Sequence, residues 1–284
     1  MKKLFYLGPQ TSYTDVAKEY FKKEFGLVDY IDVEKKTITA VAKELMSLEN
    51  DESYAILPIE NSIEGVVKES IDNITRIDDA DVKIQAECVI PINHCLVSFA
   101  DNKSDIKTII SHPQAISQCF EYIYNTFGND IEYKSESSTA NSIKNLIETD
   151  KTIGAIGSRY SAEFYGKPII EENINDEKFN QTRFLLIGKK SFNRKDVEYK
   201  TSINFETENK SGALSRILQI LEKHNISMSH ISSRPSKRSL GEYSFYIDFE
   251  GKVNDLIVDK AIFEILQNVK TFKHLGSYPV ASKI

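Results

Sequence analysis

The stretch Asn180-Gln181-Thr182-Arg183-Phe184-Leu185-Leu186-Ile187 leads from a polar segment into an apolar strand. Four consecutive apolar residues are typical of a strand that enters a core. The amide of Asn180, a hydroxyl and a guanidinium at the start of such a strand indicate a site for an anion. The alternative is a strand-entry threonine beside a surface arginine, and this segment taken alone favours that alternative.

Strand-like and helix-like segments alternate on the N-terminal side of this stretch. Strands at 4–7 and 54–59, with helices near 13–25, 39–48 and 65–74, predict a first lobe with a mostly parallel sheet. A second series, from strands at 84–90 and 94–98 to a buried strand at 153–156, predicts a second α/β lobe. We expect the strand at 184–188 to return to the first lobe, so that the chain crosses between the lobes twice.

The expected organisation therefore has three parts. Residues 1–190 form a two-lobed unit, with lobe one at about 1–76 and 178–190 and lobe two at about 77–177. Residues 191–200 are polar and charged and predict a linker. Residues 201–284 show the order βαββαβ, which is that of a ferredoxin-like domain.

Composition excludes several classes of function. The chain has 284 residues, a net charge of -6 and scattered lysines and arginines, so we expect no nucleic-acid or membrane partner. No run of about 18 apolar residues is present, which predicts a soluble, cytoplasmic protein. Cys88, Cys95 and Cys119 form no C-x-x-C pair, and this fits a reducing compartment.

Motifs for common cofactors are missing as well. The five histidines show no metal-type spacing, and neither G-x-G-x-x-G nor G-x-x-x-x-G-K-[ST] occurs. There is no G-x-S-x-G elbow, which disfavours a hydrolase. We expect a site that acts on a small molecule without a metal or a cofactor.

Polar turns follow the strands of the first lobe. Thr11, Ser12 and Tyr13 lie between a strand and a helix, where free N–H groups favour a carboxylate or phosphate. Capping by Ser12 or Thr14 is the alternative. Glu60, Asn61, Ser62 and Gly65, within Pro58–Gly65, follow the next apolar strand and point toward a pocket, although Asn61 or Ser62 could cap a helix instead.

The second lobe and the C-terminal domain carry similar turns. His112 before Pro113, and Ser138 with Thr139, start helices, and capping is again the alternative. Four such helix starts around one cleft could hold a dianion with little net positive charge. In the last domain, Gly212 opens a helix and could let a ligand carboxylate approach the backbone; a plain turn glycine is the alternative.

The motifs together resemble a known family. They are LGPQTSYT from Leu7, PIENSIEG with Asp72 downstream, SHPQA followed by Gln118-Cys119, SSTA, Asp176 with NQTRF, GAL at Gly212–Leu214 and SSRPSK from Ser232. In this order, from Leu4 to Gly276, the chain resembles the prephenate dehydratases that carry a C-terminal ACT domain. The resemblance implies a catalytic domain similar to periplasmic binding proteins and an α+β ferredoxin-like ACT domain that senses phenylalanine.

The resemblance also implies roles for individual residues. The reaction is the decarboxylating dehydration of prephenate to phenylpyruvate in L-phenylalanine biosynthesis, catalysed by a carbon-oxygen lyase. Thr182 is the expected donor or relay at the leaving hydroxyl, and Arg183 the expected partner of a substrate carboxylate. The other expected substrate-binding residues are Phe184, Asn180, Thr11, Ser12, Tyr13, Glu60, Asn61, Ser62, Gly65, His112, Ser138 and Thr139.

Regulation by L-phenylalanine is implied in the same way. The expected effector-binding residues are Ser211, Gly212, Ala213, Leu214, Ser233, Arg234 and Pro235, shared between the ACT domains of a homodimer or homotetramer. Two positions depart from the family pattern, since Thr11 replaces a usual glycine and Ser232 a usual glutamate. The chain leaves no room for a fused chorismate mutase domain, so we expect one catalytic activity.

Two other functions stay open. An arogenate dehydratase performs the same elimination on the amino analogue of prephenate, and no residue separates the two substrates. A sensor that binds an amino acid in the two-lobed cleft without reaction is the second alternative.

Overall fold

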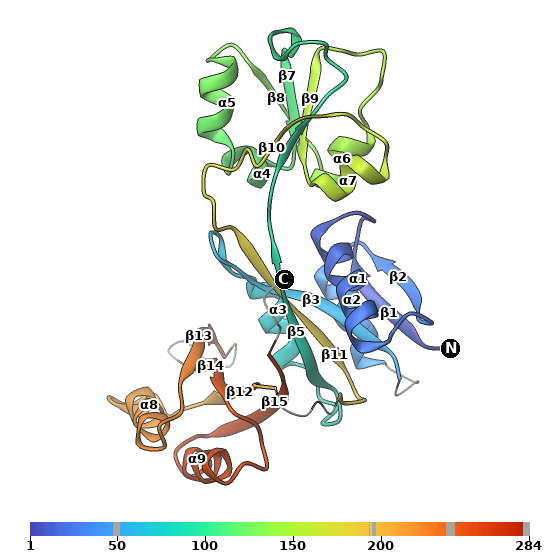
Figure 1. The fold of residues 1–284 in the computed structure, drawn as a ribbon. Coiled ribbons are helices and arrows are strands. Elements are labelled where there is room, and N and C mark those ends of the chain that lie inside the picture. Colours follow the sequence, from blue (N-terminus) through green and yellow to red (C-terminus); the bar gives the residue numbers. More distant parts are fainter. Residues whose placement is uncertain (48–51, 193, 195–196, 237–241, 281–284) are drawn as a thin grey trace.

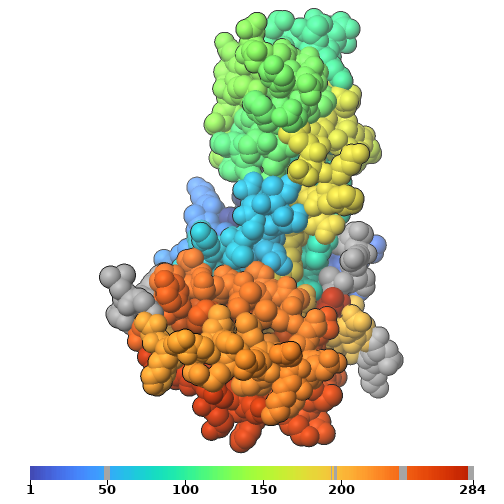
Figure 2. Space-filling view, turned by 90° about the vertical axis from the view of Figure 1, so that its left-hand side faces the viewer, coloured from blue at the N-terminus to red at the C-terminus, as the bar shows by residue number. Residues whose placement is uncertain are grey.

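The computed structural model describes residues 1–47, 52–192, 194, 197–236 and 242–280. Two α/β lobes and a C-terminal domain follow one another in space (Figure 1). In Figure 2 the second lobe (green) stands apart from the C-terminal domain (orange), with the first lobe (blue) between them. Leu48 of the expected second helix, residues 193, 195 and 196 of the expected linker, and Lys237 of the last motif lie outside the described residues.

The first lobe is built on a mixed sheet of order β2-β1-β3-β11-β5, with β4 paired to β3. Its elements are β1 (Lys3–Leu7), α1 (Tyr13–Phe25), β2 (Ile31–Lys35), α2 (Ile38–Met46), β3 (Tyr54–Asn61), β4 (Gly65–Val66), α3 (Lys68–Thr75), β5 (Lys83–Pro91) and β11 (Gln181–Gly188). Strand β1 runs parallel to β2 and β3, whereas β11 runs antiparallel to β3 and β5. The expected return of β11 to this lobe is confirmed.

One strand lies in a different lobe from the one predicted. We expected residues 84–90 to begin the second lobe, but β5 pairs with β11 along its whole length in the first sheet. An apolar strand pattern shows that a segment is buried, but not which sheet it joins. The placement of β5 and β11 also makes this sheet less parallel than predicted.

The two faces of the first sheet have different cover. Helix α1 packs on one face, where Phe21 contacts a cluster that includes Phe184 and Leu186. Helices α2 and α3 and the C-terminal domain cover the other face, where Leu185 and Ile187 belong to a cluster that includes Tyr246. Alternate residues of β11 therefore point to different surroundings.

The second lobe has a five-stranded sheet of order β10-β6-β9-β7-β8. Its elements are β6 (Cys95–Val97), the short 3₁₀ helix η1 (Lys103–Asp105), β7 (Thr108–Ser111), α4 (Pro113–Ser117), α5 (Phe120–Phe127), β8 (Glu132–Ser135), α6 (Thr139–Lys144), β9 (Ile153–Gly157), α7 (Arg159–Phe164) and β10 (Ile169–Glu172). The chain enters this lobe after β5 and leaves it before β11, so two segments connect the lobes (Figure 1).

The C-terminal domain has the predicted βαββαβ order. Its elements are β12 (Tyr199–Glu206), α8 (Ala213–Lys223), β13 (Met228–Pro235), β14 (Tyr243–Glu250), α9 (Leu256–Leu266) and β15 (Thr271–Pro279), with sheet order β13-β14-β12-β15. Helices α8 and α9 pack on one face of this sheet. Tyr246 and Tyr278 on the other face are buried against the first lobe. In the described part of the chain, no helix has both the length and the apolar character to cross a membrane.

Candidate active site

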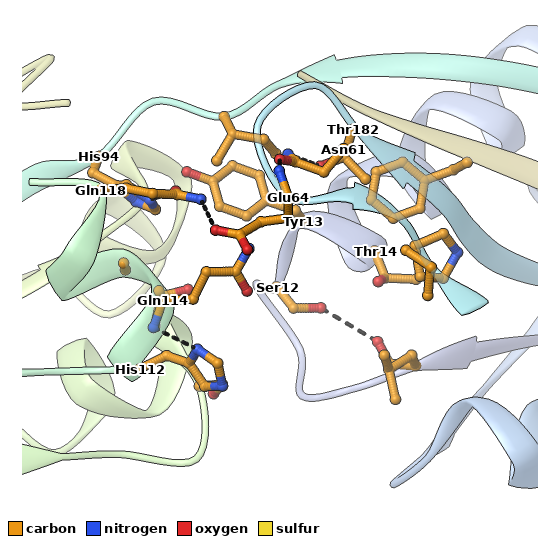
Figure 3. A pocket seen from close by; sticks show the side chains of 18 of the residues that line it. Ser12, Tyr13, Thr14, Asn61, Glu64, His94, His112, Gln114, Gln118 and Thr182 are labelled. Carbon is orange, nitrogen blue, oxygen red and sulfur yellow. Dashed lines mark hydrogen bonds between the residues drawn. The ribbon is translucent and has the colours of Figure 1, made fainter. Parts of the chain in front are cut away.

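A cleft of about 420 Å³ opens between the two lobes, close to the segments that connect them. Residues of all four polar turns line it, together with β11 (Figure 3). The lining residues are Leu7, Gly8, Ser12, Tyr13, Thr14, Pro58, Asn61, Glu64, Gly65, Val66, Val67, Ile92, His94, His112, Gln114, Ala115, Gln118, Ser137, Ser138, Thr139, Thr182 and Phe184. Of the residues predicted to bind substrate, the cleft thus contains Ser12, Tyr13, Asn61, Gly65, His112, Ser138, Thr139, Thr182 and Phe184.

Three of these residues cap helices as well as lining the cleft. Ser12 accepts a hydrogen bond from the Asp15 N–H, and Ser138 accepts one from the Asn141 N–H. His112 caps α4 through its Nδ1 atom, ahead of Pro113 at the first helical position. These turns can therefore cap helices and also bind a ligand, because a cap brings the N-terminus of its helix to the cleft.

Other predicted residues support the cleft from outside its lining. Thr11 is buried with a φ of 68°, and Ser161 of the second lobe donates to its side-chain oxygen over 2.9 Å. The backbone at this position is therefore left-handed, a conformation that threonine adopts at a greater cost than the glycine it replaces. Ser62 is exposed and donates to the Phe179 carbonyl. Neither side chain lies at the cleft surface.

Arg183 does not line the cleft, and this contradicts its predicted contact with a substrate carboxylate. Its side chain is 6% exposed and lies on the opposite face of the first sheet. There its guanidinium nitrogens lie 2.7 Å from Glu60, 3.0 Å from Glu87 and 2.6 Å from Asp248 of the C-terminal domain. Consecutive residues of a strand point to opposite faces, so Thr182 and Arg183 cannot both enter the cleft.

The half-buried Glu60 belongs to the same group of charges as Arg183, and its prediction as a substrate-binding residue is likewise contradicted. Its Oε2 atom lies 2.7 Å from Nδ1 of His230. Burial opposes its ionisation, but His230 and Arg183 outweigh burial and lower the pKa of Glu60 to about 2. Glu60 is thus an ionised part of the contact between the first lobe and the C-terminal domain.

The hydroxyl of Thr182 has a defined hydrogen-bonding role. Thr182 pairs with Asn61 across β11 and β3, and the Nδ2 atom of Asn61 donates to Oγ1 of Thr182 over 2.9 Å. Within the described residues no acceptor takes the Thr182 proton. Since the oxygen already accepts from Asn61, the hydroxyl is left as a hydrogen-bond donor to a molecule in the cleft.

A network of amides fixes Asn61 in turn. Asn61 Nδ2 also donates to Oδ1 of Asn180 over 2.7 Å, and Asn180 Nδ2 donates to Oε1 of Gln118 over 2.9 Å. Gln118 Nε2 donates to Glu64 over 3.1 Å (Figure 3). Asn180 is buried behind the cleft surface, so its predicted role in binding becomes one of positioning.

His94, which none of the sequence motifs includes, closes this network. Its Nε2 atom lies 3.2 Å from Oε1 of Gln118, and its ring meets Tyr13 edge to face. Burial, opposed by the contact with Gln118, lowers the pKa of His94 to about 4. A neutral His94 protonated at Nε2 can donate to Gln118, which fixes the orientation of that amide. Glu64, Gln114 and Gln118 were also missed as site residues, although they lie within or beside the motifs.

Polar and apolar side chains both line the cleft, which carries little charge. Its described lining includes Glu64 but no lysine or arginine. An anion in the cleft would therefore depend on hydroxyl, amide and backbone N–H donors. Helix α1, with 13 residues, begins there after its N-cap Ser12 and presents the positive end of its dipole. Among the described residues no group of three or more side chains could hold a metal ion.

Two other motif residues are structural. Both oxygens of Asp176 accept hydrogen bonds from the first backbone N–H groups of α5, at Glu121 and Tyr122. Cys119 is buried in the core of the second lobe, and burial raises the pKa of its thiol. Neither lines the cleft, so their places in the motifs reflect folding of the second lobe.

Comparison with known proteins gives the family. A family model described as prephenate dehydratase matches residues 4–192, and one described as ACT domain matches residues 201–267. The chain belongs to the prephenate dehydratase family. The prephenate dehydratase of Methanocaldococcus jannaschii is 42% identical over 98% of this chain and 98% of that one. The resemblance seen in the motifs is confirmed.

Two further relatives are informative. An Arabidopsis thaliana protein named arogenate dehydratase/prephenate dehydratase 1 is 34% identical, over 80% of this chain and 60% of its own. The structure of an Arthrobacter aurescens prephenate dehydratase in complex with L-Phe matches with a TM-score of 0.84 and 30% identity, covering 98% of this chain and 89% of that chain. The expected fold class, a two-lobed domain with an ACT domain, is confirmed, and the family is one of lyases.

The predicted effector residues gather at one end of the ACT sheet. Gly212 has a φ of 79° and caps α8, which begins with Ala213 and Leu214; Ser211 precedes it. Ser233, Arg234 and Pro235 end β13, the edge strand. Arg234 on β13 pairs with Ser244 on β14, and Ser244 pairs with Glu206 at the end of β12. Glu206 lies shortly before the Gly212 turn in the chain. Arg234 also donates to Asp72 of α3 over 2.7 Å, which links this end of the sheet to the first lobe.

Proposed function

We propose that this protein converts prephenate to phenylpyruvate, carbon dioxide and water. The observation that carries the proposal is the Thr182 hydroxyl, which Asn61 leaves free to donate into a cleft of about 420 Å³ in a member of this family. A volume of this size is within the range of small-molecule sites.

The reaction needs a hydrogen-bond donor at one atom. Loss of the ring carboxylate as carbon dioxide supplies the electron pair that aromatises the ring and breaks the bond to the ring hydroxyl. Hydroxide is a poor leaving group, so a proton must reach that oxygen as the bond breaks. Thr182 is a weak acid. Its role is that of a preorganised donor, or of a relay for a proton from water.

The remaining residues position the substrate. Donors at the N-terminus of α1, with Ser12, and at the starts of α4 and α6, with His112 and Ser138, face the cleft and suit the substrate carboxylates. A cleft without lysine or arginine in its described lining also holds the departing carboxylate less tightly than an ion pair would. Carbon dioxide can then leave from a weakly bound group.

Incubation of the purified protein with prephenate, followed through the absorbance of phenylpyruvate, tests the proposal. Phenylpyruvate should form with saturation kinetics and without added metal or cofactor. A protein that binds prephenate calorimetrically but forms no phenylpyruvate would be a non-catalytic sensor instead.

Arogenate is the second candidate substrate, because an Arabidopsis relative is named for both activities. The two substrates differ in a keto or amino group on the side chain, away from the bonds that break. Comparison of kcat/KM for prephenate and arogenate decides between them, and we expect the larger value for prephenate because the relative that is 42% identical over nearly the whole chain is named a prephenate dehydratase.

We further infer that L-phenylalanine inhibits the enzyme by binding at the end of the ACT sheet. The N-terminus of α8 at Gly212 suits the effector carboxylate, and a relative was solved in complex with L-Phe. Edge strand β13 leaves this end open to a second copy of the chain, as a homodimer or homotetramer requires. Calorimetry should detect phenylalanine binding, and Gly212→Val should weaken it, since valine does not tolerate a φ of 79°.

A further inference from the structure

A second cavity, of about 510 Å³, lies at the contact between the first lobe and the ACT domain. We call it the junction cavity. Its described walls come from β5, from Lys189, Ser191 and Arg194 after β11, from the start of β12, from the 252–254 turn after β14 and from β15. Strands β15 and β5 lie side by side here (Figure 1). Gly276 allows this, because a Cβ atom at that position would lie 2.3 Å from the Ile84 carbonyl oxygen.

The junction cavity concentrates positive charge in a chain of net charge -6. Lys83, Lys189, Arg194 and Lys252 line it, and its described lining contains no aspartate or glutamate. Carboxylates partly neutralise two of these cations from outside, since Lys189 lies 3.0 Å from Asp79 and Arg194 lies 2.7 Å from Glu24. The carboxylates leave the interior of the cavity cationic.

The positive charges of the other two cations, Lys83 and Lys252, are less fully compensated by nearby groups. The Lys83 ammonium donates to the His274 carbonyl, and burial lowers the pKa of Lys83 although the charge of Asp81 opposes this. The Lys252 ammonium lies 5.0 Å from the centre of the Tyr199 ring. Among the described residues, no carboxylate forms an ion pair with Lys83 or Lys252. Lys83 is partly buried, and an unpaired cation at such a position is stabilised when an anion joins it. Lys252 is exposed and adds a second unpaired positive charge to the lining.

We propose that the junction cavity is an anion-binding site for a small phosphorylated molecule that carries at least two negative charges. Two ammonium groups without a carboxylate partner match a dianion, and the volume admits more than the phosphate group alone. Lys189, after β11, is seven residues from Thr182, or about 23 Å along an extended strand. The site is therefore separate from the catalytic cleft, and its ligand contacts both the first lobe and the ACT domain.

Titration of pyrophosphate into the full chain by calorimetry at low ionic strength tests the proposal. We expect binding that weakens as salt is raised. The exposed Lys252 is the residue to change, because Lys252→Glu should lower the affinity by about tenfold or more, the effect of roughly 1.4 kcal/mol. Lys260→Glu, an equal charge change at an exposed position of α9 outside the cavity, is the matched control and should change the affinity less than about twofold.

Three results would overturn the proposal. The first is a wild-type chain that does not bind pyrophosphate at low salt. The second is an equal loss of affinity in Lys252→Glu and Lys260→Glu, which would show attraction by the overall field instead of a site. The third is pyrophosphate that raises KM for prephenate equally in wild type and Lys252→Glu, which would place the anion in the cleft.

Discussion

Nη2 of Arg183 in the first lobe donates to Oδ2 of Asp248 in the ACT domain over 2.6 Å. Arg183 directly follows Thr182 in the chain. Both partners are buried, and Asp248 also accepts a hydrogen bond from Ser202. The strand that carries the proposed donor is thus bound on its other face to the ACT domain.

Loss of Arg183 should be costly, because it leaves the buried Asp248 carboxylate without its cation. We expect Arg183→Met to lower the free energy of unfolding by about 3–5 kcal/mol, and Asp248→Leu to lower it by less, because Arg183 keeps Glu60 and Glu87. The double variant should lose less than Arg183→Met alone. Glu60 keeps His230, and Glu87 keeps Lys200 at 2.8 Å, so no carboxylate is left alone.

Urea unfolding of the four proteins measures this coupling. Additive losses in the double variant would contradict the importance of the pair. Steady-state kinetics of the folded double variant test the corrected role of Arg183, since KM for prephenate should stay within about threefold of wild type if the side chain never contacts substrate.

The sequence predicted the order of elements better than their pairing. The βαββαβ pattern of the last domain depends on local periodicity, which the chain carries in each segment. The pairing of β5 with β11 depends on which strand edges meet in space, and no local pattern records this. β5 was therefore assigned to the wrong lobe.

The candidate site shows the same limit. Helix starts rich in hydroxyls were visible in the sequence, and the fold brings them together around the cleft. Strand alternation by itself is enough to place Thr182 and Arg183 on opposite faces, so the sequence did contain this distinction. His94 could not have been found in this way, because its importance comes from contacts with Gln118 and Tyr13, which are distant in the chain.

The Thr182 hydroxyl can be tested by changes that keep its shape. Thr182→Val removes the hydroxyl at nearly constant volume, and we expect kcat to fall by about 10² to 10⁴. Thr182→Ser retains the donor and should keep kcat within about tenfold of wild type. The rate of phenylpyruvate formation at saturating prephenate gives kcat for both variants. A valine variant with wild-type kcat would exclude Thr182 from the chemistry.

Asn61→Asp keeps the two hydrogen bonds that Asn61 accepts but removes those that its Nδ2 atom donates, to Thr182, to Asn180 and to the Gln181 carbonyl. The Oδ1 atom of Asn61 accepts from the N–H groups of Ile63 and Glu64, at 3.0 and 2.9 Å, and a carboxylate preserves both contacts. It can no longer donate to Thr182, so the Thr182 proton turns toward the carboxylate. We expect kcat to fall by about tenfold or more.

A second variant shows whether Asn61 acts through Thr182. If it does, adding Asn61→Asp to Thr182→Val should lower kcat little beyond the valine change alone. Multiplied losses in the double variant would instead show that Asn61 acts by a route other than Thr182, through Asn180 or through the substrate itself.

The buried, neutral His94 should make the fold sensitive to mild acid. Its folded pKa of about 4 is below the usual value of 6.5, so the unfolded chain binds the proton more readily between these pH values. Stability should therefore fall as pH drops from about 6.5 to 4, by at most about 3 kcal/mol from this residue. His274, with a pKa also lowered to about 4, titrates in the same window.

Comparison with His94→Gln isolates the contribution of His94, because His274 is present in both proteins and glutamine can still donate to Gln118. We expect the urea midpoint of the variant to fall less steeply than that of wild type between pH 6.5 and 4. Parallel pH profiles for the two proteins would mean that His94 accepts its proton in the folded state as easily as in water. In that case a neutral His94 ring would not explain how Gln118, Asn180 and Asn61 are oriented toward Thr182.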